Sequence, residues 1–443
     1  MGALFDRAIA GNAVLRRATV PACLLADAAH DAQAGDLNSV DLEIVAGKIQ
    51  RIAPAGELGV QGDLVIDLDN GMVLPALVDM HTHLDKGHIW PRRPNPDGTF
   101  ASALAAVGED RIAYWTAEDV RARMEFGLRC AYAYGTSVIR THIDSLPPQD
   151  EISWPVFEAL RAEWAGRIDL QGSCLFGIDR LIEDPGFLIR IADRMKQVGG
   201  VLGAVTYMVP GLDGLLDDIF KAAMERGLDL DFHVDETGDP NAKSLRHIAE
   251  AAIRCGFSGK IVCGHCCSLA RQEESEADET LDLIAQAGIG VVSLPMCNMY
   301  LQDRMPGRTP RWRGVTLLHE MRARDIAVAV ASDNTRDPFY AYGDLDLIEV
   351  YAQATRILQL DHPIGDWVKS VSTAPAQMLG VEAGQLRVGN PADLLVFRGR
   401  NWSEILSRPG APREVLRGGV TLNETIPDYR ELDHLMTGNG AAS

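Results

Sequence analysis

Short apolar runs alternate with amphipathic, helix-like stretches through most of the chain. This rhythm is typical of strands joined by helical crossovers, which pair in parallel. Eight runs are predicted as strands, the number that a closed (β/α)8 barrel of the TIM type requires. They are residues 73–78, 137–141, 169–175, 202–205, 229–233, 261–263, 290–294 and 327–331.

Both ends of the chain follow a different pattern. Residues 13–70 alternate apolar and polar positions between Gly, Asp and Asn turns, and this pattern returns at residues 381–397. We therefore expect a small β-sandwich domain made from both chain ends. The predicted organisation is a β domain of residues 1–70 and 375–430, a barrel of residues 71–374, and a disordered tail of residues 431–443.

Composition narrows the range of partners. The 443 residues include 62 acidic and 42 basic side chains, a formal net charge of -20. A chain with this net negative charge does not attract a polyanion, so neither nucleic acid nor an anionic membrane is expected as a partner. No signal peptide and no apolar stretch near the ~20 residues of a membrane span are evident, so a cytoplasmic location is expected. Assembly into a homo-oligomer stays open.

The strongest chemical signal is His81-Thr-His83, directly after an apolar run. Alternate side chains of a strand point to the same face, so both imidazoles are placed to bind one metal ion. His233, His265 and Asp333 each follow a further predicted strand. The C-terminal strand ends of a parallel barrel share the rim that holds the active site, and the pattern therefore predicts a catalytic metal centre.

In this order of residues the chain resembles the amidohydrolase superfamily, and more closely its cytosine deaminase group. The resemblance extends from about residue 40 to about residue 420. The segments that carry it are residues 75–85 (PALVDMHTHLD), 140–144 (RTHID), 233–236 (HVDE), 264–265 (GH), 298–302 (NMYLQ) and 332–333 (SD).

The resemblance implies a role for each of these polar residues. His81, His83, His233 and Asp333 would bind the metal, Glu236 would shuttle protons, and His265 would polarise the attacking water. Binuclear members carry a bridging lysine or glutamate after the fourth strand, and residues 203–209 contain neither. We therefore expect one divalent ion per chain, zinc or iron(II), since mixed nitrogen and oxygen ligands suit both. Asp333 would accept a proton from the water that attacks an amidine-like carbon, and ammonia would leave.

Two positions depart from the cytosine deaminase pattern. Gly177 stands where that group has a glutamine that contacts the pyrimidine edge, and Asn334 stands where it has a second aspartate. Since losing a hydrogen-bonding side chain changes which ring a pocket prefers, cytosine is expected to be a poor substrate. Gly177 is also expected to leave room. A pterin, an isocytosine-like pyrimidine and an aminotriazine stay open, and the candidate substrate-binding residues are Gly177, Gln302, Asn334 and Trp312.

The predicted function is a metal-dependent hydrolytic deaminase of a small, amino-substituted N-heterocycle. A cyclic-amide or N-acyl hydrolase, which releases no ammonia, is one alternative, and a non-catalytic barrel scaffold is another. The complete set of His, Asp and Glu residues favours an enzyme, and the placement of Glu236 favours a deaminase. For His142 we favour a structural role in the core. Lys86 is expected either to line the pocket or to lie in a solvated loop, and the sequence does not decide between these two positions.

Overall fold

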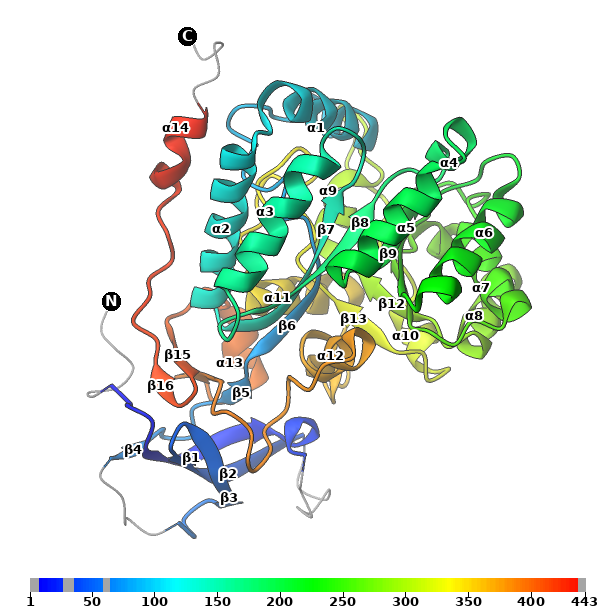
Figure 1. Ribbon diagram of the computed structural model, residues 1–443. Coiled ribbons are helices and arrows are strands. Elements are labelled where there is room, and N and C mark those ends of the chain that lie inside the picture. Colours follow the sequence, from blue (N-terminus) through cyan, green and yellow to red (C-terminus); the bar gives the residue numbers. More distant parts are fainter. Residues whose placement is uncertain (1–7, 27–35, 59–63, 437–443) are drawn as a thin grey trace. The chain divides into compact units, whose positions relative to one another are not determined.

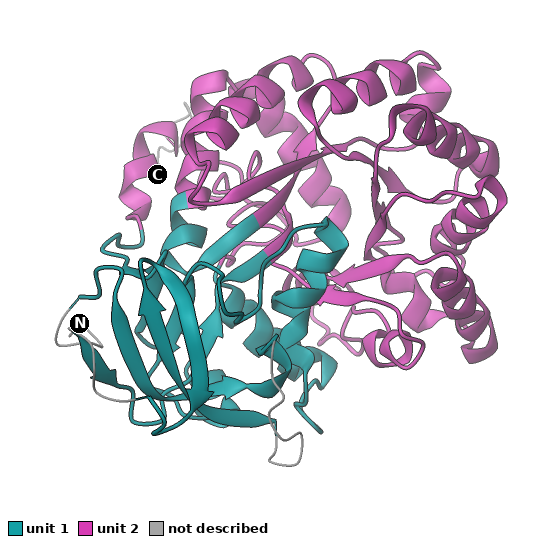
Figure 2. Cartoon of the chain, turned by 60° about the horizontal axis from the view of Figure 1, so that its bottom comes forward, with its two compact units in different colours: residues 1–78, 129–138, 346–426 teal, residues 79–128, 139–345, 427–443 magenta. Residues whose placement is uncertain are grey.

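The computed structural model describes residues 8–26, 36–58 and 64–436. The chain divides into two compact units, shown in two colours in Figure 2. Residues 71–78, 129–138 and 346–374, which the sequence pattern placed in the barrel, belong to unit 1, and residues 427–430, which it placed in the β domain, belong to unit 2. Unit 1 comprises residues 1–78, 129–138 and 346–426, and unit 2 comprises residues 79–128, 139–345 and 427–443.

Eight strands among the described residues form the predicted barrel, which confirms the (β/α)8 fold. One sheet has the order β6-β7-β8, and the other has the order β13-β12-β11-β10-β9 with parallel pairing throughout. Bridges between Gly177 and Val205 and between Thr82 and Asp333 join the two sheets. The strands are β6 (Leu77–Thr82), β7 (Thr136–Asp144), β8 (Asp169–Leu175), β9 (Leu202–Thr206), β10 (Leu230–Val234), β11 (Ile261–His265), β12 (Gly290–Ser293) and β13 (Val328–Val330).

The predicted strand over residues 73–78 is wrong. Its first half is β5 (Val73–Pro75), which pairs antiparallel with β14 (Leu394–Phe397) in unit 1. The barrel strand begins only at Leu77. Pro75 has no N–H to donate to a ladder, which places it at the end of a strand. His81 therefore lies inside β6 and not beyond its end.

Helices follow the barrel strands in chain order, and Figure 1 shows α5 to α8 outside the strands. Gly199, Gly227 and Gly256 end α5, α6 and α7 at φ of 62°, 67° and 61°, a left-handed conformation that suits glycine. None of the described helices is long and apolar enough to cross a membrane. The helices are α1 (Phe100–Tyr114), α2 (Ala117–Ala133), α3 (Asp150–Glu163), α4 (Arg180–Glu183), α5 (Phe187–Val198), α6 (Leu212–Arg226), α7 (Ser244–Cys255), α8 (Glu274–Gln286), α9 (Pro295–Leu301) and α10 (Leu318–Arg322).

Unit 1 contains a β-sandwich made from both chain ends, as expected. Its sheets have the orders β3-β2-β1-β4 and β16-β15-β14-β5. Leu15 and Leu42 share one buried core with Leu394 and Leu416. The remaining elements are β1 (Ala13–Pro21), β2 (Leu37–Val45), β3 (Lys48–Pro54), β4 (Val65–Asp67), β15 (Arg413–Arg417), β16 (Val420–Thr421), α11 (Leu347–Leu358), α12 (Thr373–Leu379) and α13 (Trp402–Ser407).

The expected disordered tail is helical in its first part. Residues 431–436 complete the short helix η4 (Tyr429–Leu432) and form α14 (Asp433–Met436). The Tyr429 ring packs 3.8 Å from the Arg336 guanidinium, and Arg92 donates to the carbonyl of Leu435 at 3.1 Å. The rest of the expected tail, residues 437–443, lies outside the described residues.

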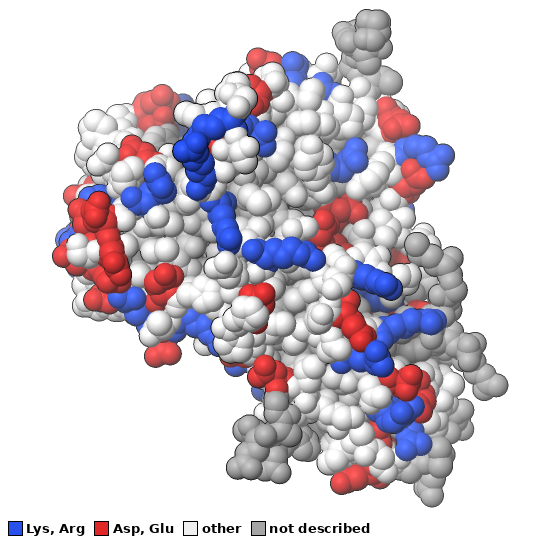
Figure 3. All heavy atoms as spheres, turned by 180° about the vertical axis from the view of Figure 1, so that it is seen from behind, with Lys and Arg blue, Asp and Glu red and all other residues white. Residues whose placement is uncertain are grey.

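Exposed ion pairs link neighbouring barrel helices. Arg226 of α6 pairs with Asp193 of α5 at 2.7 Å, and Arg254 of α7 pairs with Asp217 of α6 at 2.6 Å. On the face in Figure 3, basic and acidic side chains lie among one another. Each exposed pair contributes only ~0–1 kcal/mol, so these pairs add little to the stability of the barrel.

A buried network of ion pairs on α2 contributes more to stability than these exposed pairs. Asp119, 5% exposed, accepts hydrogen bonds from Arg92 and from Arg123, whose Nη2 lies 2.7 Å from Asp119 Oδ2. Burial alone would raise the pKa of Asp119, but the two arginines outweigh it and lower the pKa. Arg123 in turn donates to the carbonyls of Asp85 and Gly87, the latter at 3.2 Å. The network therefore fixes the loop that follows β6.

Asp119→Asn should destabilise the fold by about 3–5 kcal/mol, because it leaves two buried guanidinium groups short of a counter-charge. Glu163→Gln is the matched control, since Glu163 forms a half-exposed pair with Arg121 at 2.6 Å and should cost less than about 1 kcal/mol. Urea unfolding of the two variants measures the difference. Equal losses would contradict the role given to the buried network.

Candidate active site

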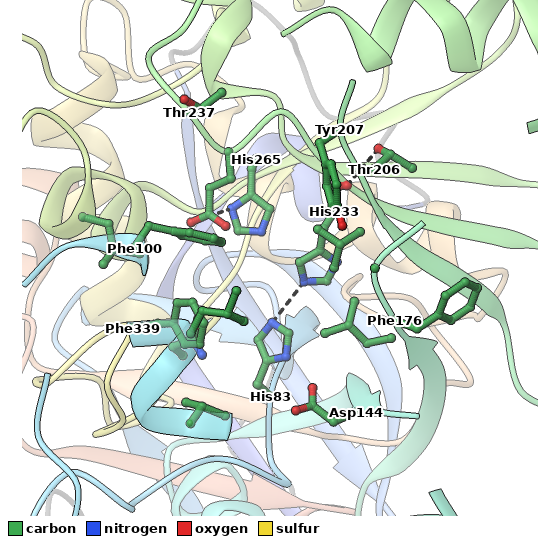
Figure 4. Close-up of a pocket in the computed structure, with 18 of the residues that line it drawn as sticks. His83, Phe100, Asp144, Phe176, Thr206, Tyr207, His233, Thr237, His265 and Phe339 are labelled. Atoms are coloured by element: carbon green, nitrogen blue, oxygen red, sulfur yellow. Dashed lines mark hydrogen bonds and ion pairs between the residues drawn. The ribbon is translucent and has the colours of Figure 1, made fainter. Parts of the chain in front are cut away.

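Three imidazoles converge at the C-terminal end of the barrel. His81 in β6 and His83 directly after it lie two positions apart, so both side chains point into the barrel. The Nε2 atom of His233, from β10, lies 3.1 Å from Nε2 of His81 and 3.1 Å from Nε2 of His83. Burial lowers the pKa of each of the three well below its usual value, which leaves the rings neutral. Figure 4 shows His83 and His233 facing each other.

Asp333 completes the cluster from the last barrel strand. Its backbone N–H donates to the carbonyl of His81 at 2.8 Å, and its Oδ1 lies 3.3 Å from His83 Nε2 and 3.7 Å from His81 Nε2. Asp333 and His265 adopt φ of 62° and 68°. Such left-handed backbone costs about 1–3 kcal/mol per non-glycine residue and is typical of functional sites.

This donor set fits a divalent metal ion. Ligand atoms about 2.0–2.1 Å from a tetrahedral ion stand about 3.3–3.4 Å apart, close to the 3.1–3.7 Å between the Nε2 and Oδ1 atoms here. Neither oxygen of the Asp333 carboxylate has a hydrogen-bond partner within the described chain. Burial raises the pKa of Asp333 to about 8, an effect that a bound cation would oppose. These residues therefore form a histidine-rich potential metal site.

A buried ion network lies beneath the cluster. The His142 ring centroid is 4.1 Å from that of His81, and its Nε2 lies 3.1 Å from Asp231 Oδ1. Arg140 donates to Asp231 Oδ2 at 2.9 Å and to Gln171 Oε1 at 2.9 Å. The network connects β7, β8 and β10 below the metal-binding positions. His142 lies in the core, where the sequence placed it, and its ring is also grouped with those of His81, His83 and His233, which could hold a metal ion.

Glu236 and His265 are joined by an amide that the sequence analysis did not assign. Asn298 in α9 donates from Nδ2 to Glu236 Oε1 at 3.1 Å, and the same atom lies 2.9 Å from His265 Nδ1. Burial lowers the pKa of His265 to about 3, so the ring is neutral. With Nδ1 accepting from Asn298, the ring proton lies on Nε2. Burial and the nearby Asp333 carboxylate raise the pKa of Glu236 well above its usual value.

A cavity of about 760 Å³ opens above these groups. One face of α1 forms a wall of it through Phe100, Leu104, Val107 and Arg111, which are three or four residues apart. Figure 4 shows Phe100 and Phe339 on one side of the histidines and Phe176 and Tyr207 on the other. The volume suits a ligand larger than a single small ring.

Known proteins similar to this chain identify the family to which it belongs. The model of the amidohydrolase family matches residues 200–422. A pterin deaminase from Rhizobium rhizogenes is 54% identical, over 96% of this chain and 97% of that protein. The chain belongs to the amidohydrolase family. The predicted activity class, a hydrolytic deaminase, is thereby confirmed, as is the prediction of an enzyme.

Other amidohydrolases are more distant. The N-isopropylammelide isopropyl amidohydrolase of a Pseudomonas species is 27% identical, over 81% of this chain and 87% of that protein. The solved structure of 5-methylcytosine deaminase from Klebsiella pneumoniae with phosphonocytosine has a TM-score of 0.80 at 23% identity, and covers 93% of this chain and 98% of that one. The latter match shows the shared fold.

The expected free space at Gly177 is not there in this amidohydrolase. A Cβ atom on Gly177 would lie 2.6 Å from Asp179 Oδ1 and 2.9 Å from the Tyr207 hydroxyl. Burial and a hydrogen bond to Asp179 raise the pKa of Tyr207 above its usual range. The position of the missing glutamine is therefore filled by a carboxylate and a phenol, which line the same cavity.

The other three candidate substrate-binding residues differ in placement. Gln302 lines the cavity and donates to the backbone carbonyl of Glu236 at 3.0 Å. Asn334 also lines it, but its amide nitrogen donates to Asp337 at 2.8 Å. Trp312 is absent from the cavity wall and packs against the Arg271 guanidinium.

Asn298→Ala should lower kcat for ammonia release by about 10- to 100-fold with metal retained, because Glu236 and His265 both lose the amide that orients them. Asn241→Ala, in an exposed loop, is the matched control. Metal analysis and an ammonia assay on both variants check the effect. Unchanged kcat in Asn298→Ala would show that neither group depends on this amide.

Proposed function

We propose that this protein is a pterin deaminase that hydrolyses the 2-amino group of a 2-amino-4-oxopteridine and releases ammonia. The observation that carries the proposal is the 54% identity to the Rhizobium rhizogenes pterin deaminase over nearly the whole of both chains. The cavity of about 760 Å³ supports it, since a fused bicyclic ring needs more space than cytosine. A cytoplasmic location and a homo-oligomer stay predictions.

His81, His83, His233 and Asp333 would hold one divalent ion, zinc or iron(II). When bound, such an ion supplies Lewis acidity that makes hydroxide available from water near neutral pH. His265 would donate from Nε2 to the attacking oxygen, and Asp333 would accept the proton that the water loses. Both groups face the same cluster, since His265, His81 and Asp333 present ligand atoms within 4.8 Å of one another.

Glu236 would supply the proton that the ring needs. Its raised pKa keeps a proton on the carboxyl group, which donates it to the ring nitrogen beside the reacting carbon. The carbon becomes tetrahedral as the water oxygen adds. Its bond to the amino group then breaks as that group takes up the proton that Asp333 accepted, and the proton left on the added oxygen returns to the Glu236 carboxylate as the carbonyl forms. The products are the 2,4-dioxo ring and ammonia.

Purified protein should contain about one divalent ion per chain, and His83→Asn should hold less than about a tenth of that, because it removes one of four ligands. His247→Asn is the matched control, since His247 pairs with Asp213 outside the cluster. Elemental analysis measures both. A value near two ions per wild-type chain would contradict the single-ion proposal.

Wild-type protein should release ammonia from pterin, and Glu236→Gln should lose about 10²- to 10⁴-fold in kcat while keeping its metal, because the amide cannot transfer the proton. Glu250→Gln, which alters a surface ion pair on α7, should retain full activity. Ammonia release and the ultraviolet spectrum of the product follow the reaction. Hydrolysis without ammonia would favour a cyclic-amide hydrolase, and no turnover by metal-loaded protein would favour a scaffold.

A further inference from the structure

Lys86 is a buried ammonium group beside the catalytic cluster that has no part in the proton transfers above. It is 5% exposed, and its Nζ donates to Asp144 Oδ1 at 2.6 Å. An ammonium group has three N–H donors and no acceptor. Asp144 is the acceptor found for it among the described residues, and Lys86 lines the same cavity as Glu236 and Asp333. Donor capacity is therefore available to a ligand.

Hydrogen bonds fix both the backbone on either side of Lys86 and the carboxylate that pairs with it. Arg123 in α2 donates to the carbonyls of Asp85 and Gly87, the two chain neighbours of Lys86. Arg111 in α1 donates to the other carboxylate oxygen of Asp144 at 3.0 Å. The lysine is therefore held on a braced loop, and its carboxylate partner is held from a helix.

The group formed by Lys86, Arg111 and Asp144 carries one more positive than negative charge. Lys86 and Arg111 are two cations that share the single carboxylate of Asp144. Burial alone would lower the pKa of Lys86, but Asp144 and Asp85 outweigh it and raise the pKa, so the ammonium form persists. A buried ammonium group favours a ligand that places an oxygen acceptor beside it. It disfavours a ligand that places an N–H group there, because two donors then face each other.

We propose that Lys86 is a specificity-determining residue that donates to the ring carbonyl of the substrate, so that the site takes 2-amino-4-oxo rings and rejects 2,4-diamino rings. This inference rests on the proposed function. Figure 4 shows Asp144, the partner of Lys86, on the side of His83 away from His265, which contacts Glu236. A ring whose nitrogen meets Glu236 at one edge thus turns its carbonyl edge toward Lys86.

The test compares kcat/KM for pterin and for 2,4-diaminopteridine in wild type, Lys86→Met and Lys86→Gln. Wild type should prefer pterin by at least about 10²-fold, because a site built for one hydrogen-bonding group rejects the analogue that lacks it. Lys86→Met should lower the pterin value about 10- to 100-fold and leave the diamino value within about 3-fold. Lys86→Gln should accept both rings, since an amide both donates and accepts.

Metal content and unfolding temperature separate this role from a structural one. Lys369→Met, which breaks a more exposed lysine–aspartate pair with Asp366 in unit 1, is the control for the substitution itself and should keep the wild-type preference. If Lys86→Met does not fold or hold metal, Lys86→Gln carries the test. Pterin turnover with an unchanged preference in the folded Lys86 variants would overturn this inference alone. No ammonia from either ring in wild type would overturn the proposed function with it.

Discussion

The bridge that joins the first and last barrel strands is the contact on which the site depends. The N–H of Asp333 donates to the carbonyl of His81, and the two residues are about 250 positions apart in the chain. This backbone hydrogen bond lies at one of the bridges that join the two barrel sheets, and it sets a carboxylate against two imidazoles. The parallel register of β10 and β11 then brings His233 and His265 to the same rim. The cluster therefore exists only when the whole ring of strands has formed.

The lone pairs and carboxylates of this cluster repel one another unless a cation lies among them. Neutral imidazole nitrogens stand 3.1 Å apart, and buried carboxylates at Asp333 and Glu236 raise the cost of ionising each other. Two residues of the rim also have left-handed backbone. A cation would relieve the repulsion between lone pairs and stabilise the folded barrel relative to the unfolded chain. A metal ion bound by these atoms would therefore also stabilise the barrel.

The sequence predicts which candidate metal ligands lie together, because their placement follows local rules. His81 and His83 are two positions apart on a strand, and His233 ends a neighbouring run, so period and strand order suffice. The space at Gly177 depends on Tyr207, which follows a different strand, and no local pattern predicts that contact. Asn298 is similar, because its role depends on where α9 points. The available signal was its place in residues 298–302, one of the segments that carry the family resemblance.

The wall that α1 contributes separates two properties of the enzyme. The residues proposed for proton transfer and metal binding lie at buried strand ends, whereas another part of the cavity is lined by one helix face, on which Leu104 is 59% exposed. An exposed residue on this face such as Leu104 can change without disturbing strand register or the ion pair of Arg111 with Asp144. A substitution there alters the surface that a ligand meets while the strand-end residues stay in place, so substrate range and chemistry depend on different parts of the fold.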